Sequence, residues 1–524
     1  MGWGNRSSSD EEHEEAKLLI QSDVLTGKEE SGFELQLEDG APGYAWPIGL
    51  AFTVNYIIGT GFLSLPYAFE DGGVVESTIM VILASFLAFV ALTWQLEILA
   101  RVEPVLQARE GEAGVEKDFL GDGVADDGDG GAFLVSHRVY ELPRLCEVYV
   151  GTWFSRLYVL AITLYMYGTL WLYAAVVGQS LAFIIPLPWL TVGSLAACQG
   201  DGENCVHYDT DCRVAYSFYL LLVGCIVVPI SCVDLSEQKA LQVCLSFVRG
   251  GGILTALLCI IGAMFTWPYE EYLLGDAYSE GEGRDSPPYI YPNTTLFSFG
   301  GLAPILTAAV YSQLMHHSTP GLCSLVKDKT KLQRTFLSSF GTCTVVYFLL
   351  GITAALYFGP NINQTLSLMW GTYQDGWSKS DAWWTYFCKY FVLVFPSVEV
   401  ISAYPLSAIT LGNNLFSAVP PEFRNGPRKG WWKLGCRLVA TVPPLLLALI
   451  THCLTTIVEF TGLPAFFIMF VFPGILQLMS RRESRKHFGH DRTYYTWPFS
   501  SEISIYSVFV FAALAFSVTV YSII

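Results

Sequence analysis

Apolar blocks of roughly 20 residues, nearly free of charge, recur along this chain and constrain its fold more than any other feature. An α-helix rises about 1.5 Å per residue, so such a block crosses the roughly 30 Å hydrocarbon core of a bilayer. Hydrophobic residues make up 52% of the sequence and charged residues 15%, whereas soluble domains carry about 25% charged residues. No β-barrel alternation is present. The sequence therefore predicts an all-α polytopic membrane protein.

Eleven blocks qualify, and we expect each to form one transmembrane helix. The expected spans are 44–70, 74–99, 153–185, 213–233, 242–265, 297–317, 333–357, 384–411, 433–455, 457–479 and 499–524. An odd number of spans places the two termini on opposite sides of the membrane.

The net charge of −18 comes mainly from two segments outside the spans. Residues 1–43 and 101–131 together hold twenty acidic and six basic residues, which accounts for 14 of the 18 excess negative charges. We expect 1–43 to be a disordered acidic tail, 44–524 to be the transporter-like membrane domain, and 101–152 to be an acidic loop between spans two and three. Such acidity excludes DNA or RNA as a partner.

The distribution of lysine and arginine orients the spans, because basic residues concentrate in cytoplasmic loops. With the N-terminus in the cytoplasm, only Arg213, Arg284 and Lys379 fall in the outside loops. The inside loops then hold Lys327, Lys329, Lys331, Arg334, Arg424, Arg428, Lys429, Lys433, Arg481, Arg482, Arg485, Lys486 and Arg492. We therefore predict a cytoplasmic N-terminus and a lumenal or extracellular C-terminus.

Two kinds of modification signal fall in the predicted outside loops. The triplets at Asn293 and Asn363 are N-glycosylation acceptors, with unused triplets as the alternative interpretation. Cys198, Cys205 and Cys212 cluster where a disulfide can persist, and their odd number allows at most one bond among them. The other cysteines lie mostly within helices, where packing is the expected role.

The acidic tail carries a sorting signal of its own. Residues 14–19 (EEAKLL) resemble an acidic dileucine motif, which favours a lysosomal, vacuolar or endosomal location over the plasma membrane. An accidental leucine pair is the alternative. No cleavable signal peptide is expected before the first span. Sorting or signalling proteins are possible partners of this tail.

The first span contains a segment that is poorly suited to a continuous helix. In residues 55–66 (NYIIGTGFLSLP), Gly59 and Gly61 flank Thr60, and Pro66 lacks an amide hydrogen. Broken helices inside a membrane are tolerated where the freed backbone groups line a cavity and bind ligands. A close-packed interface of small residues is the alternative.

The sixth span repeats this irregularity. It opens with residues 299–304 (FGGLAP) and closes with residues 316–320 (HHSTP). Interrupted spans at positions one and six are typical of a five-plus-five inverted repeat, in which five spans reverse the orientation of the second half.

These features together resemble the amino acid/auxin permease family of the APC superfamily. The first-span pattern Asn-x-Ile-x-Gly-Thr-Gly-x-Leu, the segment 315–320 (MHHSTP) and the segment 404–414 (YPLSAITLGNN) carry the resemblance, which covers residues 44–524 and is strongest to the transmembrane protein 104-like branch. The resemblance implies a LeuT-like fold with eleven transmembrane helices, five plus five and one extra.

The resemblance also implies a substrate site at the membrane midplane. Gly59, Thr60 and Gly61 would hold the charged ends of an amino acid, helped by Tyr311 and Ser312 in the unwound part of span six. Asn55 matches a position that is linked to sodium in sodium-coupled members. The partner hydroxyl expected in span eight falls on Ala408, with Ser407 beside it, which puts a sodium site in doubt.

Glu399 is an ionisable residue near the middle of span eight. A charge at that depth costs about 2.5–3.5 kcal/mol on insertion scales, so such a carboxylate is protonated, paired or functional. One hypothesis is that Glu399 couples transport to protons. The alternative is a structural ion pair with a basic residue such as Arg249 in span five.

Catalysis and metal binding have little support in the sequence. Adjacent His316 and His317 would point about 100° apart on a helix, and no metal-binding spacing or nucleophile–base arrangement is present. We therefore expect no cofactor, no metal and no enzyme activity. We expect a secondary active transporter of neutral amino acids, coupled to H⁺ rather than Na⁺. The alternative is an amino-acid-sensing receptor with little transport.

Overall fold

The computed structural model describes most of the membrane domain. The described residues are 46–59, 61–112, 132–185, 187, 210–232, 239–266, 295–373, 377–378, 380–417, 419–424, 426–451 and 453–523. They belong to one compact unit, Pro42–Ile524. The predicted acidic tail 1–43 and residues 113–131 of the predicted acidic loop therefore lie outside the described residues.

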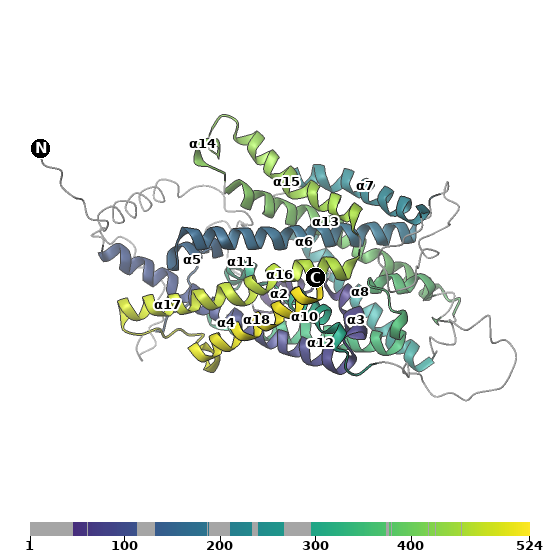
Figure 1. Cartoon of the computed structure of the whole chain (residues 1–524), viewed down its shortest axis with the longest axis horizontal. Coiled ribbons are helices and arrows are strands. Elements are labelled where there is room, and N and C mark those ends of the chain that lie inside the picture. Colours follow the sequence, from purple (N-terminus) through teal and green to yellow (C-terminus); the bar gives the residue numbers. More distant parts are fainter. Residues whose placement is uncertain are drawn as a thin grey trace, which may run out of the picture. The chain divides into compact units, whose positions relative to one another are not determined.

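The described part of the chain is helical apart from an isolated bridge between Phe133 and Thr493 (Figure 1). In the first half, the helices are α2 Trp46–Ile57, α3 Gly61–Asp71, α4 Val74–Glu112, α5 Leu142–Tyr149, α6 Thr152–Ile184, α7 Thr210–Cys232 and α8 Lys239–Thr266. In the second half, they are η2 Phe299–Gly301, α10 Leu302–Ser312, η3 His316–Ser318, α11 Thr319–Leu325, η4 Lys329–Lys331, α12 Leu332–Phe358, η5 Gly359–Asn361, η6 Leu366–Thr372, α13 Trp383–Ser417, α14 Pro421–Arg424, α15 Lys429–Ile450, α16 Leu454–Phe466, the π-helix η8 Phe467–Val471, α17 Phe472–Phe488, η9 Pro498–Ser500 and α18 Glu502–Ile523.

Nine helical stretches in the described part are long and apolar enough to cross a membrane. Their outward faces are also apolar: on α18, Val510 is 60% exposed and Leu514 is 64% exposed. Apolar side chains in such numbers face lipid rather than water. The protein is therefore an integral membrane protein. The first and sixth predicted spans are not among the nine because each is divided into shorter helices.

Helix α4 continues well beyond its predicted end at residue 99. It has 39 residues and is about 58 Å long, nearly twice the thickness of the hydrocarbon core. The apolar block ends near residue 99, but most residues after it favour helix, and α4 continues through Pro104 to Glu112. The predicted loop 101–152 thus starts as part of α4 and closes with the short helix α5.

Contacts between helices follow the predicted five-plus-five repeat. In the described part, four of the five spans of the first half pack on their counterparts five spans later: α3 on α10, α4 on α12, α6 on α13 and α7 on α15. Cross-contacts come in related pairs, since α6 packs on α15 as α13 packs on α7, and α6 packs on α16 as α13 packs on α8. The all-helical class and the LeuT-like repeat are thereby confirmed, with α18 as the additional helix.

Backbone hydrogen bonds join the C-terminal end of α3 to the N-terminal end of α10. The Ser298 amide donates to the Gly72 carbonyl over 3.1 Å, and the Val74 amide donates to the Thr295 carbonyl over 3.0 Å. A methyl group on Gly301 would lie 2.3 Å from the carbonyl carbon of Asp71, so only glycine allows this approach. The end of α3 and the start of α10 therefore share one tight junction.

Candidate functional site

The first broken span unwinds between α2 and α3, at the two glycines that the sequence marks. The Gly59 amide bonds to the Ile57 carbonyl over 2.8 Å, which is a turn too tight for an α-helix. Among the residues that the structure describes, a methyl group on Gly59 would meet no atom within 4 Å, whereas one on Gly61 would lie 3.1 Å from Tyr311. Gly59 therefore borders open space, and Gly61 is packed against α10.

The second broken span unwinds after Ser312, where α10 ends. Gln313, Leu314 and Met315 separate α10 from η3. Tyr311 and Ser312 are buried at the end of α10. The predicted substrate residues Gly61, Tyr311 and Ser312 are therefore neighbours in the structure. Thr60 lies outside the described residues.

Tyr347 of α12 connects the two breaks. Its hydroxyl lies 3.1 Å from the Ile57 carbonyl oxygen and 3.0 Å from the Ser312 carbonyl oxygen. The side chain is fully buried. The sequence offered no signal for this residue, because it is a single tyrosine in an apolar span.

Arg249 of α8 also contacts the backbone of the first break. Its guanidinium Nη1 donates to the Ile58 carbonyl, and Nη2 lies 2.5 Å from Oε1 of Glu399. Glu399 is 3% exposed. The structure contains the ion pair between Glu399 and Arg249 that the sequence suggested. The pair joins α8 and α13 to the unwound segment of the first span.

An aromatic cluster adjoins the breaks. The ring of Tyr165 on α6 lies 6.0 Å from that of Tyr311 and 5.5 Å from that of His317. The Tyr56 hydroxyl on α2 lies 3.4 Å from Nε2 of His317 and accepts a hydrogen bond from Ser318. Phenol and imidazole groups from three spans therefore meet at the same level as the unwound backbone.

The two adjacent histidines face different neighbours, as a helical geometry predicts. Nε2 of His316 lies 2.9 Å from the Ala88 carbonyl oxygen on α4, while His317 faces Tyr56 and Tyr165. They do not converge on a common point. Among the described residues no group of three His, Cys, Asp or Glu side chains could hold a metal ion.

Gln313 was not singled out by the sequence and is the most unusual polar residue of the break. Its side chain is fully buried, and within the described part of the chain neither its amide oxygen nor its amide nitrogen has a hydrogen-bond partner. Leaving such a group unpaired costs about 1–3 kcal/mol. Gln313 is thus a candidate contact for a polar ligand.

Two predicted ion-coupling residues receive less structural information. Asn55 lies on α2, but its side chain is not described. Ser407 is half-buried on α13, eight positions after Glu399 and so about 12 Å further along the helix. The structure therefore does not bring Ser407 to the Arg249–Glu399 pair.

Most predicted modification sites lie outside the described residues, namely Cys198, Cys205, Asn293 and the side chain of Cys212. Asn363 is described, and its Oδ1 accepts a hydrogen bond of 2.9 Å from the Thr365 amide. Cys453, between α15 and α16, is disulfide-bonded, although cysteines outside the loop cluster were expected to serve packing.

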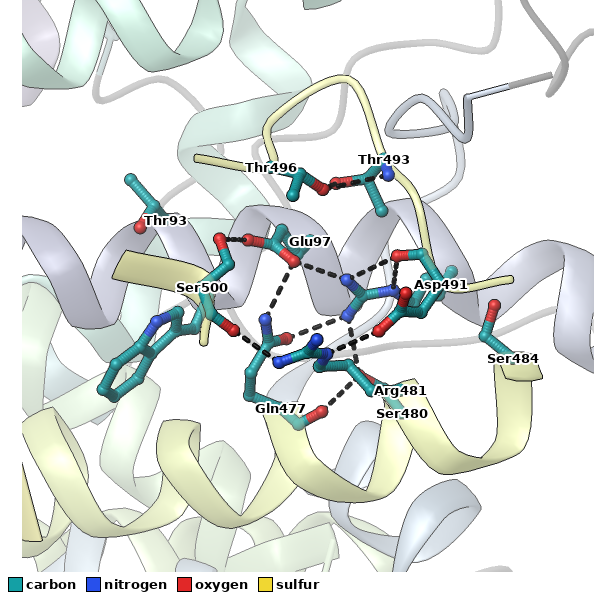
Figure 2. A network of polar contacts seen from close by, with 12 residues as sticks. Thr93, Glu97, Gln477, Ser480, Arg481, Ser484, Asp491, Thr493, Thr496 and Ser500 are labelled. Atoms are coloured by element: carbon teal, nitrogen blue, oxygen red, sulfur yellow. Dashed lines mark hydrogen bonds and ion pairs between the residues drawn. The ribbon is translucent and has the colours of Figure 1, made fainter. Parts of the chain in front are cut away.

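A second polar cluster lies toward the C-terminal ends of α4 and α17. We call this end of the protein the basic end, because it carries Lys327, Lys331, Arg481 and Arg485. Figure 2 shows this network. Arg101 pairs with Glu97, donates to Gln477 over 2.9 Å, and donates through Nε to the Asp491 carbonyl over 3.1 Å. Glu97 and Arg101 are at most 1% exposed. The network fixes α4 to α17 and to the segment that precedes α18.

The carboxylate of Asp491 also forms ion pairs with Arg481 and Arg485 of α17. Burial alone would raise the pKa of its carboxyl, but hydrogen bonds and charge from Arg481 and Arg485 lower that pKa below its ordinary value. Nε of Arg481 lies 2.6 Å from Oδ2 of Asp491. The segment before α18 is therefore tied to α17 by ionised groups.

Comparisons with known proteins place the chain in a family. A family model described as "transmembrane amino acid transporter protein" matches residues 43–524. Transmembrane protein 104 of Mus musculus is 24% identical over 487 residues, which cover 85% of this chain and 90% of that protein. The transmembrane protein 104 homolog of Drosophila melanogaster is 24% identical over 519 residues, 91% of this chain and 96% of the relative. A crystal structure of MhsT in complex with L-phenylalanine has a TM-score of 0.48 and 11% identity, and the match covers 92% of this chain and 100% of that one.

Proposed function

Because the chain belongs to the transmembrane amino acid transporter family, we propose that it is a secondary active transporter that moves neutral amino acids by alternating access, coupled to protons. The observation that carries the proposal is the meeting of two broken helices, with Gly61 against Ser312 and with unwound backbone on both sides. In membrane transporters, broken helices of this kind hold the charged ends of substrates.

The two half-helices supply opposite partial charges for an amino acid. The N-terminus of α3 at Gly61 presents amide hydrogens and the positive end of a helix dipole, which suits a carboxylate. The C-terminus of α10 at Ser312 carries the negative end of a helix dipole, which suits an ammonium group. Gln313 and the Tyr165–Tyr311 pair would contact the rest of the substrate.

A neutral substrate follows from the charges beside the break. Arg249 and Glu399 form an ion pair there, so their charges cancel locally. A substrate with a charged side chain would enter a low-dielectric site without a counter-charge, which is costly. Polar and aromatic partners are available, and they suit a neutral side chain.

Proton coupling is proposed for the Arg249–Glu399 pair. Of the two groups, the carboxylate of Glu399 is the one that can take up a proton. Protonation would end the ion pair, while the guanidinium would keep its bond to the Ile58 carbonyl. Loss of the ion pair would change the contacts of α8 and α13 with the unwound segment of the first span. Proton coupling requires such a link between protonation and the conformation of the substrate site. A sodium site using Asn55 and Ser407 is the less favoured mechanism.

The experiment is uptake of labelled neutral amino acids into proteoliposomes with and without an inward proton gradient. Wild-type protein should accumulate substrate only with the gradient. Glu399→Gln should lose the response to the gradient while still exchanging substrate. Glu459→Gln, which changes a half-buried carboxylate on α16, is the matched control and should behave as wild type.

Two results would contradict the proposal. If Glu399→Gln is folded and keeps its pH dependence, Glu399 does not couple transport to protons. If the protein binds amino acids saturably without flux, and if deletion of residues 1–43 abolishes a signalling response, the sensing function is the correct one.

For orientation, we propose eleven crossings with the basic end in the cytoplasm. The basic residues at that end follow the positive-inside rule. The disulfide at Cys453, between α15 and α16, suits an oxidising lumen or cell exterior at the opposite end. Endosomes or lysosomes are the proposed compartment. Removal of N-glycans with a glycosidase should shift the wild-type protein on a gel, and Asn293→Gln with Asn363→Gln should abolish that shift.

A further inference from the structure

The hydroxyl of Tyr347 donates to backbone carbonyl groups of both broken spans. It comes from a third helix, α12, and lies within 3.1 Å of carbonyl oxygens on Ile57 and Ser312. Its ring is buried on the face of α12 that also carries Cys343 and Gly351. The hydroxyl has one proton, which these two acceptors share.

Carbonyl oxygens at unwound helices have a known alternative use, which is to coordinate Na⁺. Here the carbonyls that flank the breaks are engaged by donors of the protein itself. Ile57 accepts from the Gly59 amide and from Tyr347, Ser312 accepts from Tyr347, and Ile58 accepts from Arg249. Each of these three oxygens therefore already accepts a hydrogen bond from the protein, and a cation would have to compete with that donor.

We propose that Tyr347 is a positioning residue that takes the place of a structural cation between the two breaks. It holds Ile57 and Ser312 at the distance at which a substrate can contact both half-helices. This inference rests on the proposed transport function, and it adds that substrate binding requires no alkali cation.

A covalently attached hydroxyl differs from an ion in one important respect. An ion leaves when the site opens, whereas Tyr347 stays with α12 and keeps α2, α10 and α12 together. The proposed role of Tyr347 is therefore to keep the two breaks in the same relative position, while the Arg249–Glu399 contact, which comes from α8 and α13, is the one proposed to change.

The first test measures the thermal stability of the purified wild-type protein in NaCl, KCl and choline chloride at equal ionic strength. Equal stability in the three salts is expected, because resident donors fill the cation position. A stabilisation specific to Na⁺ would overturn the proposal. This measurement needs neither substrate nor flux, so its failure is distinguishable from failure of the proposed function.

The second test compares Tyr347→Phe with a matched control, Tyr404→Phe. Tyr404 is an equally buried tyrosine whose hydroxyl donates to the Thr441 carbonyl over 2.7 Å, between α13 and α15. In Tyr347→Phe, hydrogen exchange at residues 57–59 and 312–315 should be about two- to tenfold faster, as expected for the loss of one hydrogen bond. In the control, exchange at these residues should be unchanged.

A third readout separates a positioning role from ordinary packing. With the hydroxyl removed, the carbonyls of Ile57 and Ser312 become available to Na⁺, so Tyr347→Phe should be more stable in NaCl than in choline chloride. Tyr404→Phe should show no such difference. If both variants lose stability equally in all salts, Tyr347 only fills space and the proposal is wrong. Should Tyr347→Phe not fold, the salt series on the wild-type protein decides.

Discussion

Gly61 lies so close to Ser312 that a methyl group on Gly61 would stand 3.2 Å from the Cβ atom of Ser312. Such contacts are tighter than ordinary van der Waals packing, so the residue at position 61 controls how near the two breaks can come. Gly59, two residues earlier, has no such neighbour. Gly61 therefore allows the close approach of α3 and α10, whereas Gly59 borders open space.

The first prediction exploits that difference. Gly61→Ala should lower the free energy of unfolding by about 1–3 kcal/mol, because the methyl group must displace α10. Gly59→Ala should change stability by less than about 0.5 kcal/mol but reduce amino acid binding, because its methyl group enters the open space. Thermal shift with and without a panel of neutral amino acids measures both effects. Unchanged binding in Gly59→Ala would remove Gly59 from the substrate site.

A second prediction concerns the packing of α6 on α16. A methyl group on Gly168 would lie 2.2 Å from Oγ1 and 2.8 Å from Cβ of Thr461, a side chain that is 1% exposed. Gly168→Ala should therefore destabilise the protein by about 1–3 kcal/mol. Gly341→Ala on α12 is the control, since a methyl group there meets nothing within 4 Å. It should stabilise the helix by about 0.5–1 kcal/mol. Equal stability of the two variants would argue against this packing.

A third prediction concerns the buried pair Glu97–Arg101. Arg101→Met leaves the Glu97 carboxylate buried without its counter-charge and should cost about 3–5 kcal/mol. Arg144→Met, which breaks the exposed pair with Glu147, should cost about 0–1 kcal/mol. Denaturation in detergent measures both.

A double variant completes this test. Glu97→Gln combined with Arg101→Met removes both charges and should recover part of the loss, because no lone charge stays buried. If the two single losses simply add, Glu97 and Arg101 do not act as a pair.

A fourth prediction follows from the lowered pKa of Asp491. A carboxyl whose pKa is lower in the folded state stabilises that state fully above its unfolded pKa of about 3.9, and the contribution is lost as the pH falls through the folded pKa. The stability difference between wild type and Asp491→Asn should thus be constant from pH 8 to pH 5 and shrink below about pH 4. Thermal unfolding over that range measures it. A difference that shrinks already near pH 6 would contradict the assignment.

The sequence predicted the fold well because its strongest signals are physical and local. Apolar blocks mark the spans, and Gly59 with Gly61 marks the first break. The end of α4 was missed because the apolar block stops at the membrane surface while the helix continues to Glu112. Composition locates the membrane boundary, and it says less about where a helix ends.

The site could be predicted only in part. Arg249 was named as a partner of Glu399 because few basic residues lie inside spans, and this contact is present. Tyr347 was out of reach, since the chain has 28 tyrosines and no local pattern separates this one from the rest. Gln313 became a candidate because its side-chain amide is buried without a hydrogen-bond partner in the described part of the chain. Its burial depends on helices that are distant in sequence. Local patterns identify where a backbone breaks, whereas tertiary packing decides which side chains meet there.

The junction between α3 and α10 has a mechanical consequence. Gly301 lies against the Asp71 carbonyl, and Ser298 is bonded to Gly72, so the two half-helices on that side are joined at their ends. A displacement of either half-helix must carry the other with it. We therefore expect the pair to swing as a single lever about the unwound segments, so that one hinge motion opens or seals the passage on that side.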